Sequence, residues 1–360
     1  VTAVEGTRGL VSVRFDDRSS DYGPATIDKL QPRPADYFPG MALYAQDRLR
    51  EVAKDDAVAF VKLALASHRD GQLSYRELKG SITDLLGDKG WRNWWKEAKP
   101  ALKREPMIGM SSGSQPSFRL LRQADKYEDR QRRKFDHAKD PQDKLLLVMG
   151  YLDEISREEK NGTCDGCVDE DLLAHFGNGA AKVAVGALKE QPGLALAGLA
   201  LHAEIAGRGV AVARPNPKAA AQVLARIPDK GTLNADLPEA LLQRVLNYVR
   251  DAIPEAWGDT WSAVLMRAGK RLCDSITRTL IEGGQTEALA SALDQAIERP
   301  TSSPDLLCWL WRTRFTSGAA ARFLESRDDL PVIRIADAMI VLLDSSGKLY
   351  GMSLEEKHLK

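Results

Sequence analysis

From residue 142 to residue 344 the sequence is a series of amphipathic segments separated by short turns. Within each segment apolar residues recur at helical spacing, and Gly, Pro or Asn marks the interruptions. The eleven segments are residues 142–158, 180–190, 193–206, 217–227, 237–252, 255–267, 270–283, 285–298, 304–315, 318–326 and 331–344. Helices joined by short loops bury their apolar faces by stacking on their neighbours. The sequence therefore predicts an α-helical repeat region of the HEAT or armadillo kind over residues 124–350, without a fixed repeat period.

The N-terminal residues 1–36 are predicted to form a small β-module. The stretch TRGLVSVRF is rich in β-branched residues, and ATIDKLQP is predicted as a second strand after the turn-rich DDRSSDYGP. The proline-rich QPRPADYFPG then marks a domain boundary. At the other end of the chain, residues 351–360 are predicted to be a polar tail.

Residues 37–123 contain three helical patterns followed by a hairpin pattern. The first, DDAVAFVKLALASHR, has Asp55 or Asp56 available as N-cap, and Ser74 and Glu77 have the spacing of a capping box before the second. The third is WRNWWKEAKPALKR, and MIGMSSGSQPSFRLL has two extended runs joined by a Ser/Gly/Pro-rich turn. Helix, helix, helix and hairpin is the order of a winged helix. The predicted fold class is mainly α, with the β-module, a winged-helix-like domain and the helical repeat in sequence.

The third pattern places its tryptophans and its cations on different sides of a helix. One sector of about 100° is apolar and is predicted to face the core; it holds Trp91, Trp94, Trp95, Ala98 and Leu102. Another sector of about 60° is basic; it holds Arg92, Lys96, Lys99 and Lys103. Pro100 lacks a main-chain donor, so a kink at this residue would divide the basic sector.

The basic sector has two interpretations. The chain carries 51 basic and 51 acidic residues, but residues 89–134 hold 13 Lys/Arg against 5 Asp/Glu, so any attraction to nucleic acid is local. The third helix of a winged helix enters a DNA groove or meets a partner. The candidate nucleic-acid or partner-binding residues are therefore Arg92, Lys96, Lys99, Lys103, Arg104 and Arg119. The alternative is that these cations form only the solvated face of an amphipathic helix.

A second basic segment follows the hairpin, with Tyr127 and Phe135 among its cations, which are Arg130, Arg132, Arg133 and Lys134. Aromatic rings beside basic residues can stack on nucleic-acid bases. The segment is also typical of a solvated helix that links two domains.

The sequence offers little that is typical of an enzyme or of a cofactor site. Cys164 and Cys167 have metal-ligand spacing, but only His175 follows within reach, and a structural zinc site needs four ligands. The stretch ASHRDGQLSYREL imitates half of a calcium loop but lacks the first two ligands. GNGAAK, residues 177–182, does not match a phosphate-binding loop and is predicted to be a turn that opens a helix. We expect no metal, no cofactor and no catalytic activity.

The cysteine content predicts the cellular compartment of the chain, and its hydropathy indicates whether it could span a membrane. Four cysteines that do not form a disulfide framework favour a reducing, cytoplasmic compartment, and no signal peptide is visible. The longest apolar run, GLALAGLALHAEIAGRG, is interrupted after about nine residues, short of the ~20 that a membrane-spanning helix needs. We expect no membrane association.

Residues 1–122 resemble the N-terminal extension of long Gre-type transcription elongation factors, the GreA/GreB family. The likeness lies in GTRGLVSVRFDD, DDAVAFVKLAL and above all GWRNWWKEAKPALKREPMIG, followed by the arginine-containing SFRLL. Two departures are visible. Pro100 stands where such helices carry another polar residue. The acidic D-x-S-E-N-like motif, through which Gre factors support transcript cleavage in RNA polymerase, does not occur in these 360 residues.

The resemblance implies a non-catalytic region of a Gre-like factor that docks on RNA polymerase, on DNA or RNA, or on both. The helical repeat would then serve as a scaffold for other proteins. A second hypothesis is a protein-interaction adaptor that binds no nucleic acid, and a third is an enzyme whose carboxylates come together from distant positions. The sequence does not give the oligomeric state.

Overall fold

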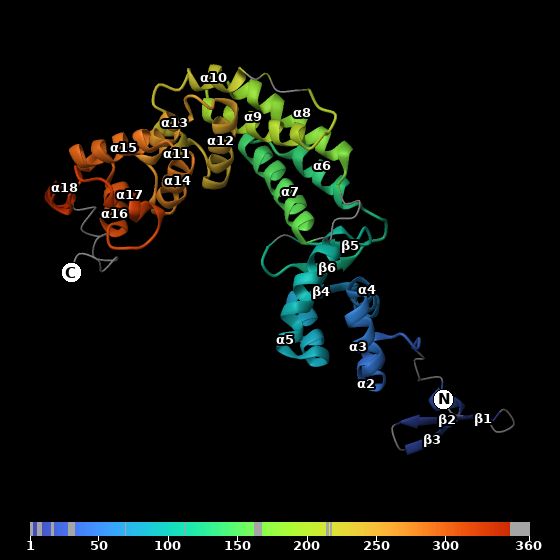
Figure 1. The fold of residues 1–360 in the computed structure, drawn as a ribbon. Helices are drawn as coiled ribbons and strands as arrows, with labels where there is room; N and C mark the ends of the chain where they lie inside the picture. The colour runs from blue at the N-terminus through green and yellow to red at the C-terminus, as the bar shows by residue number, and fades with distance from the viewer. Residues whose placement is uncertain are drawn as a thin grey trace. The chain divides into compact units, whose positions relative to one another are not determined.

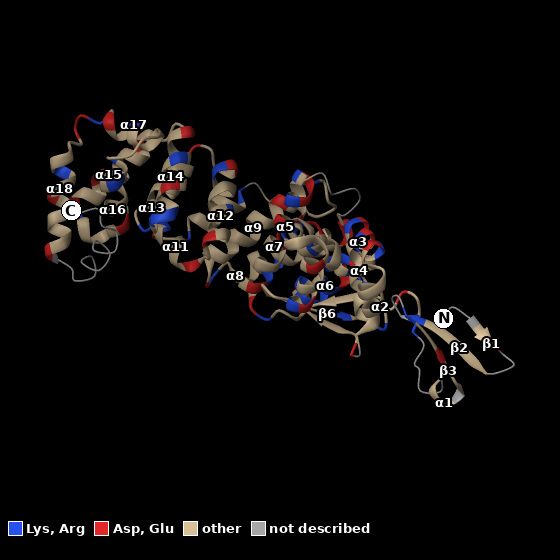
Figure 2. Cartoon of the chain, turned by 90° about the horizontal axis from the view of Figure 1, so that it is seen from below, with Lys and Arg blue, Asp and Glu red and all other residues tan. Residues whose placement is uncertain are grey.

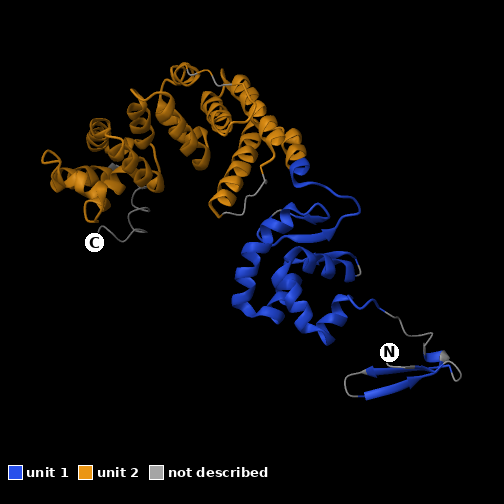
Figure 3. Ribbon diagram, turned by 45° about the vertical axis from the view of Figure 1, so that its right-hand side comes forward, with its two compact units in different colours: residues 1–130 blue, residues 131–360 orange. Residues whose placement is uncertain are grey.

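The computed structural model describes residues 3–5, 9–15, 18–27, 33–68, 70–111, 113–161, 168–213, 216 and 218–345. The chain is mainly α-helical with a small antiparallel sheet at its N-terminus (Figure 1). It divides into two compact units, residues 1–130 and residues 131–360 (Figure 3). None of the described helices is both long and apolar enough to cross a membrane. Cys164, Cys167 and the predicted tail at 351–360 lie outside the described residues.

The N-terminal sheet is a three-stranded antiparallel meander. Its strands β1 (Ala3–Glu5), β2 (Leu10–Phe15) and β3 (Arg18–Tyr22) are hydrogen-bonded in the order β1-β2-β3. The predicted second strand was wrong, because ATIDKLQP opens with a helical turn, α1 (Pro24–Ile27). The pairing strand is β3, within the predicted turn. Four of its five residues are exposed, so main-chain hydrogen bonds rather than apolar alternation form it, and a hydropathy pattern cannot reveal it.

The rest of unit 1 is a winged helix preceded by two further helices. Its elements are α2 (Phe38–Tyr44), α3 (Gln46–Asp55), α4 (Ala57–Ser67), β4 (Gln72–Ser74), α5 (Tyr75–Arg104), β5 (Ile108–Met110) and β6 (Ser117–Leu120). The strands form an antiparallel sheet in the order β4-β6-β5. The predicted hairpin at β5 and β6 is confirmed. Helices α2 and α3 and the strand β4 were not predicted from the sequence.

The long helix α5 consists of two segments separated at Gly87. This residue has φ 75° and ψ 170°, a conformation that favours glycine because it has no side chain to clash. The two segments correspond to the second and third predicted helices. On the N-terminal side of the break, the Arg50 side chain donates from Nε to the Leu85 carbonyl oxygen at 3.0 Å. That bond satisfies a main-chain acceptor near the end of the first segment.

Unit 2 is built of helices that pack on near neighbours in sequence. After α6 (Tyr127–His137), which spans the division between the units, come α7 (Pro141–Asn161), α8 (Glu170–Ala187), α9 (Pro192–Gly207), α10 (Ala219–Leu224), α11 (Leu233–Asp236), α12 (Glu239–Ala252), α13 (Trp257–Leu265), α14 (Lys270–Glu282), α15 (Thr286–Glu298), α16 (Pro304–Thr313), α17 (Ala319–Glu325) and α18 (Val332–Ser345). Two short 3₁₀ helices, Lys230–Thr232 and Pro300–Ser302, lie between them.

The packing follows the chain: α8 lies on α9, α9 on α12, α13 on α14 and α15, and α16 on α18 (Figure 1). Each of the eleven predicted segments contains a helix. Arginines join neighbouring elements by ion pairs; Arg244 of α12, for example, bonds both Asp153 of α7 and Glu204 of α9.

Helix α8 begins about ten residues earlier than predicted, at Glu170, and contains the GNGAAK stretch. The prediction of a turn there was wrong. Gly177 faces side chains of Ile205 and Val212, and a Cβ added at Gly179 would overlap the buried ring of Phe135. Both glycines therefore permit a close approach to α8, a packing role that the local sequence does not show.

We predict that Gly179→Ala lowers the free energy of unfolding by about 1–3 kcal/mol, because the new methyl group displaces the Phe135 ring from a packed position. Gly186→Ala in the same helix is the matched control, since nothing outside the adjacent backbone of α8 lies within 4 Å of its added Cβ. The control is expected to leave stability unchanged or to raise it by up to about 1 kcal/mol. Chemical denaturation of both variants measures the difference. Equal effects would contradict the packing role.

Candidate nucleic-acid interface

The second segment of α5 turns its tryptophans into the core of unit 1, as predicted. Trp91 and Trp94 are 5% and 7% exposed, Ala98 and Leu102 are fully buried, and Trp95 is half-buried against the core. The Trp94 indole Nε1 donates a hydrogen bond of 2.6 Å to the carbonyl oxygen of Ala53 in α3. The apolar side of the helix is therefore fixed by packing and by a buried polar bond.

Ring contacts extend this anchor across the winged helix. Trp91 stacks on Trp95 with ring centroids 5.3 Å apart, and Tyr75 packs edge-on against both rings. Trp95 in turn meets Phe118 of β6 at 6.1 Å. Because these rings come from both segments of α5 and from the hairpin, the cluster holds the helix against the sheet.

A different side of this segment carries a line of exposed cations. Arg92, Lys96 and Lys99 are all exposed, and Lys89, which the sequence analysis missed, is exposed one turn earlier. Spacings of three and four residues place all four on one face of the helix. We call these four residues the cationic ridge. Lys89 was overlooked because it precedes the first tryptophan, although its i−3 spacing from Arg92 could have identified it.

Pro100 does not divide the predicted basic sector. Within α5 only Gly87 departs from helical dihedral angles, so the helix continues through Pro100. No ion pair joins a ridge residue to a carboxylate in the described part of unit 1. The one ring contact of the ridge is that of Lys99, whose Nζ lies 6.0 Å from the centroid of the Trp95 ring.

Lys103 and Arg104, also candidates from the sequence, are placed differently. Both are half-buried and pack on the ring of Tyr127, at 4.8 Å and 5.4 Å from its centroid. Arg104 also forms an ion pair of 3.5 Å with Glu128. These two cations join α5 to the start of α6, so among the cations predicted on this helix the exposed ones are Arg92, Lys96 and Lys99.

Arg119 lies apart from the ridge. Side chains alternate between the two faces of a strand, and in β6 it is Phe118 that is buried against α5. Arg119 therefore lies on the other face of the sheet, where its side chain passes over its register partner Gly109. It belongs to the wing and does not extend the line of cations on the helix.

The second basic segment is part of the fold. Tyr127 and Phe135 are both buried, so neither ring is available to stack on a base. Arg130 donates to the carbonyl oxygens of Lys103 at 2.6 Å and Ile108 at 3.1 Å. It thus satisfies an acceptor in the last turn of α5, where helices leave carbonyl groups unpaired.

No group of three or more His, Cys, Asp or Glu side chains in the described ranges is placed to hold a metal ion. His175, the third zinc candidate, contacts Asp136 through Nε2 at 2.7 Å. Asp169 caps α8 by accepting from the Leu172 amide at 2.7 Å. In unit 2 blue and red segments occur on neighbouring helices (Figure 2), in keeping with the ion pairs between them.

The order α4, β4, two segments of α5, β5 and β6 defines a winged helix-turn-helix, with the cationic ridge on its last helix. Residues 41–124 match the family model of the GRAD helix-turn-helix domain, under a quarter of the chain. No curated protein and no solved structure matches the chain.

The start of α5 is set by the predicted capping box, which the structure confirms. The Ser74 amide donates to Glu77 Oε2 at 2.7 Å, and the Glu77 amide donates to Ser74 Oγ at 3.3 Å. Glu77 of the calcium-like loop is thereby used as a cap. The hydrogen bond from the Ser74 main chain, followed by that from its side chain, lowers the pKa of Glu77 below its ordinary value of 4.5.

We predict that the wild type is more stable than Glu77→Gln near neutral pH and that this advantage is lost at acid pH. A lowered folded-state pKa stabilises the fold above pH 4.5, and this contribution is lost as pH falls through the folded-state value. The difference in free energy of unfolding should be present above pH 4.5 and shrink at acid pH. Urea denaturation across a pH series measures it. Parallel curves for the two proteins over the whole range would contradict the role of the ionised carboxylate.

Proposed function

We propose that unit 1 binds nucleic acid through the cationic ridge, Lys89, Arg92, Lys96 and Lys99. The observation that carries this proposal is the line of four exposed cations on the last helix of a helix-turn-helix. In such domains this helix is the one that enters the major groove of DNA.

The dimensions of the ridge suit a phosphate backbone. Residues 89 and 99 lie about 15 Å apart along the axis at 1.5 Å per residue. One DNA strand carries about four phosphates over that length of its axis. Lysine and arginine contacts to phosphate give affinity and position but no sequence information. The ridge therefore supports binding that is sensitive to salt and largely independent of sequence.

Reversing the charge of the four ridge residues tests this proposal. If each ridge cation neutralises one phosphate, the wild type should bind duplex DNA with a slope of log K against log salt of about −3 to −4. Replacing all four residues by Glu should abolish binding while the thermal unfolding midpoint stays near that of the wild type. Fluorescence anisotropy at several salt concentrations gives the affinity and the salt slope, and thermal denaturation gives the midpoint.

The matched control reverses four exposed cations of unit 2, Lys182, Lys189, Arg226 and Arg299, so that the net charge changes by the same amount. The control should retain the affinity and slope of the wild type. If both variants lose binding equally, the effect is one of net charge and the ridge has no special role.

We further propose a place in transcription with RNA polymerase as the protein partner and no catalytic step of the chain's own. The support is the resemblance of residues 1–122 to the extension of Gre-type factors, and the lack of the acidic cleavage motif from the sequence. Unit 2 favours a scaffold role, because four of its arginines, Arg208, Arg244, Arg267 and Arg327, form ion pairs that join its elements.

An adaptor without nucleic-acid binding is the second candidate, and one experiment separates the two. The full chain and the ridge variant are used to capture proteins from a nuclease-treated lysate. Docking on polymerase through the scaffold predicts that both recover RNA polymerase subunits to the same extent. Recovery by both, together with a lack of DNA binding by the wild type, would favour the adaptor. Failure of both to recover polymerase would contradict the transcription proposal.

A further inference from the structure

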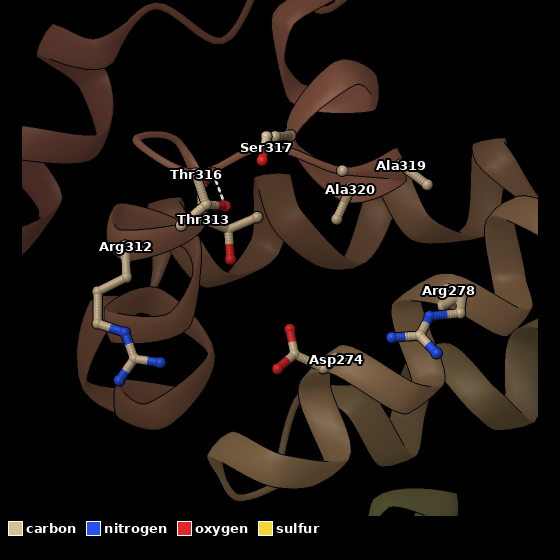
Figure 4. Close-up of a pocket in the computed structure, with 10 residues that line it drawn as sticks. Asp274, Arg278, Arg312, Thr313, Thr316, Ser317, Ala319 and Ala320 are labelled. Atoms are coloured by element: carbon tan, nitrogen blue, oxygen red, sulfur yellow. Dashed lines mark hydrogen bonds between the residues drawn. The ribbon is translucent and has the colours of Figure 1, made fainter.

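A polar pocket lies in unit 2 between α14, α16 and the turn that leads into α17 (Figure 4). Its volume is about 290 Å³. Arg278 of α14 and Arg312 of α16 line it from different helices, and Thr313, Thr316 and Ser317 line it beside Arg312. The Thr316 hydroxyl donates to the Thr313 carbonyl oxygen at 2.9 Å, so the hydroxyl groups left to donate to a ligand are those of Thr313 and Ser317.

A carboxylate on α14 completes the pocket. Asp274 Oδ1 accepts a hydrogen bond of 2.6 Å from the indole Nε1 of the buried Trp309. This bond holds the carboxylate in place, and Oδ2 makes no hydrogen bond to the described residues. On the same helix the exposed Arg278 has neither an ion pair nor a hydrogen bond within the described part of the chain. The pocket thus combines a donor group for an anion with an acceptor group for a hydroxyl or an amine.

The chemistry of these groups selects the ligand. Guanidinium groups bind phosphate through paired hydrogen bonds, and the hydroxyl groups of Thr313 and Ser317 can donate to the remaining phosphate oxygens. Two arginines and one aspartate give the lining a net charge of +1, from +2 and −1. The volume lies at the lower end of the range for small-molecule sites and leaves space for more than a bare phosphate ion.

We propose that this pocket binds a small organic phosphate monoester that also carries a hydroxyl or amino group. The phosphate lies against Arg278 and accepts from the hydroxyl groups of Thr313 and Ser317, and the ligand's own donor bonds Asp274 Oδ2. The site is separate from the cationic ridge and does not depend on the nucleic-acid proposal.

Isothermal titration of the full chain with glycerol 3-phosphate, inorganic phosphate and glycerol, at constant ionic strength, tests the site. Glycerol 3-phosphate should bind about tenfold more tightly than inorganic phosphate, since only it can use Asp274, and glycerol alone should not bind measurably. Arg278→Gln should weaken glycerol 3-phosphate binding about tenfold or more, the loss expected for a charge-assisted hydrogen bond. Arg271→Gln is the matched control, because Arg271 is exposed on the same helix two turns earlier and does not line the pocket.

Asp274→Asn is an independent test, because it should raise the affinity for inorganic phosphate whereas Arg278→Gln lowers phosphate affinity. The amide oxygen keeps the bond from Trp309, while loss of the negative charge should raise the affinity for inorganic phosphate and reduce the preference for glycerol 3-phosphate. Unfolding midpoints equal to that of the wild type show that the variants are folded. The proposal is overturned if neither phosphate compound binds at concentrations up to about 10 mM, or if Arg278→Gln and Arg271→Gln have the same effect. If the ridge variant abolishes glycerol 3-phosphate binding and the pocket variants do not, the phosphate binds to unit 1. That result would also contradict the proposal.

Discussion

The hydrogen bond from the Trp94 indole to the carbonyl oxygen of Ala53 fixes the rotation of α5 about its own axis. Both residues are buried, and separating such a pair would leave an unsatisfied donor and acceptor, which costs about 1–3 kcal/mol. Trp91 and Trp95 stack beside this bond and resist the same rotation. Because the side chains of one helix keep fixed angles to each other, holding the indoles inward turns the ridge cations outward. The fixed rotation of α5 thus both buries the indoles in the core of unit 1 and exposes the ridge cations.

Features that depend on local periodicity could be predicted from the sequence. Every amphipathic segment from residue 142 onward contains a helix, and the apolar sector of α5 is buried as its spacing predicts. The capping box at Ser74 and the hairpin at β5 and β6 also follow from short patterns. These succeed because the side chains that decide the structure lie within a few residues of one another.

Features decided by distant partners could not be predicted. Gly177 and Gly179 indicate a turn by composition, yet packing against Phe135 and Val212 keeps them inside a helix. Lys103 and Arg104 belong to a basic stretch, but the Tyr127 ring draws them into the fold. A polar strand such as β3, with four of its five residues exposed, carries too weak a hydropathy signal to be recognised.

The break at Gly87 uncouples the two halves of α5. In an unbroken helix each inserted residue turns everything beyond it by about 100°. At Gly87 the angle between the halves is set by one pair of dihedrals and not by the number of residues before it. A change of length in residues 75–86 can therefore be absorbed at this joint. The same change in residues 88–94 would swing the later lysines toward the protein interior and the indoles toward water, so the two halves should differ sharply in their tolerance of insertions.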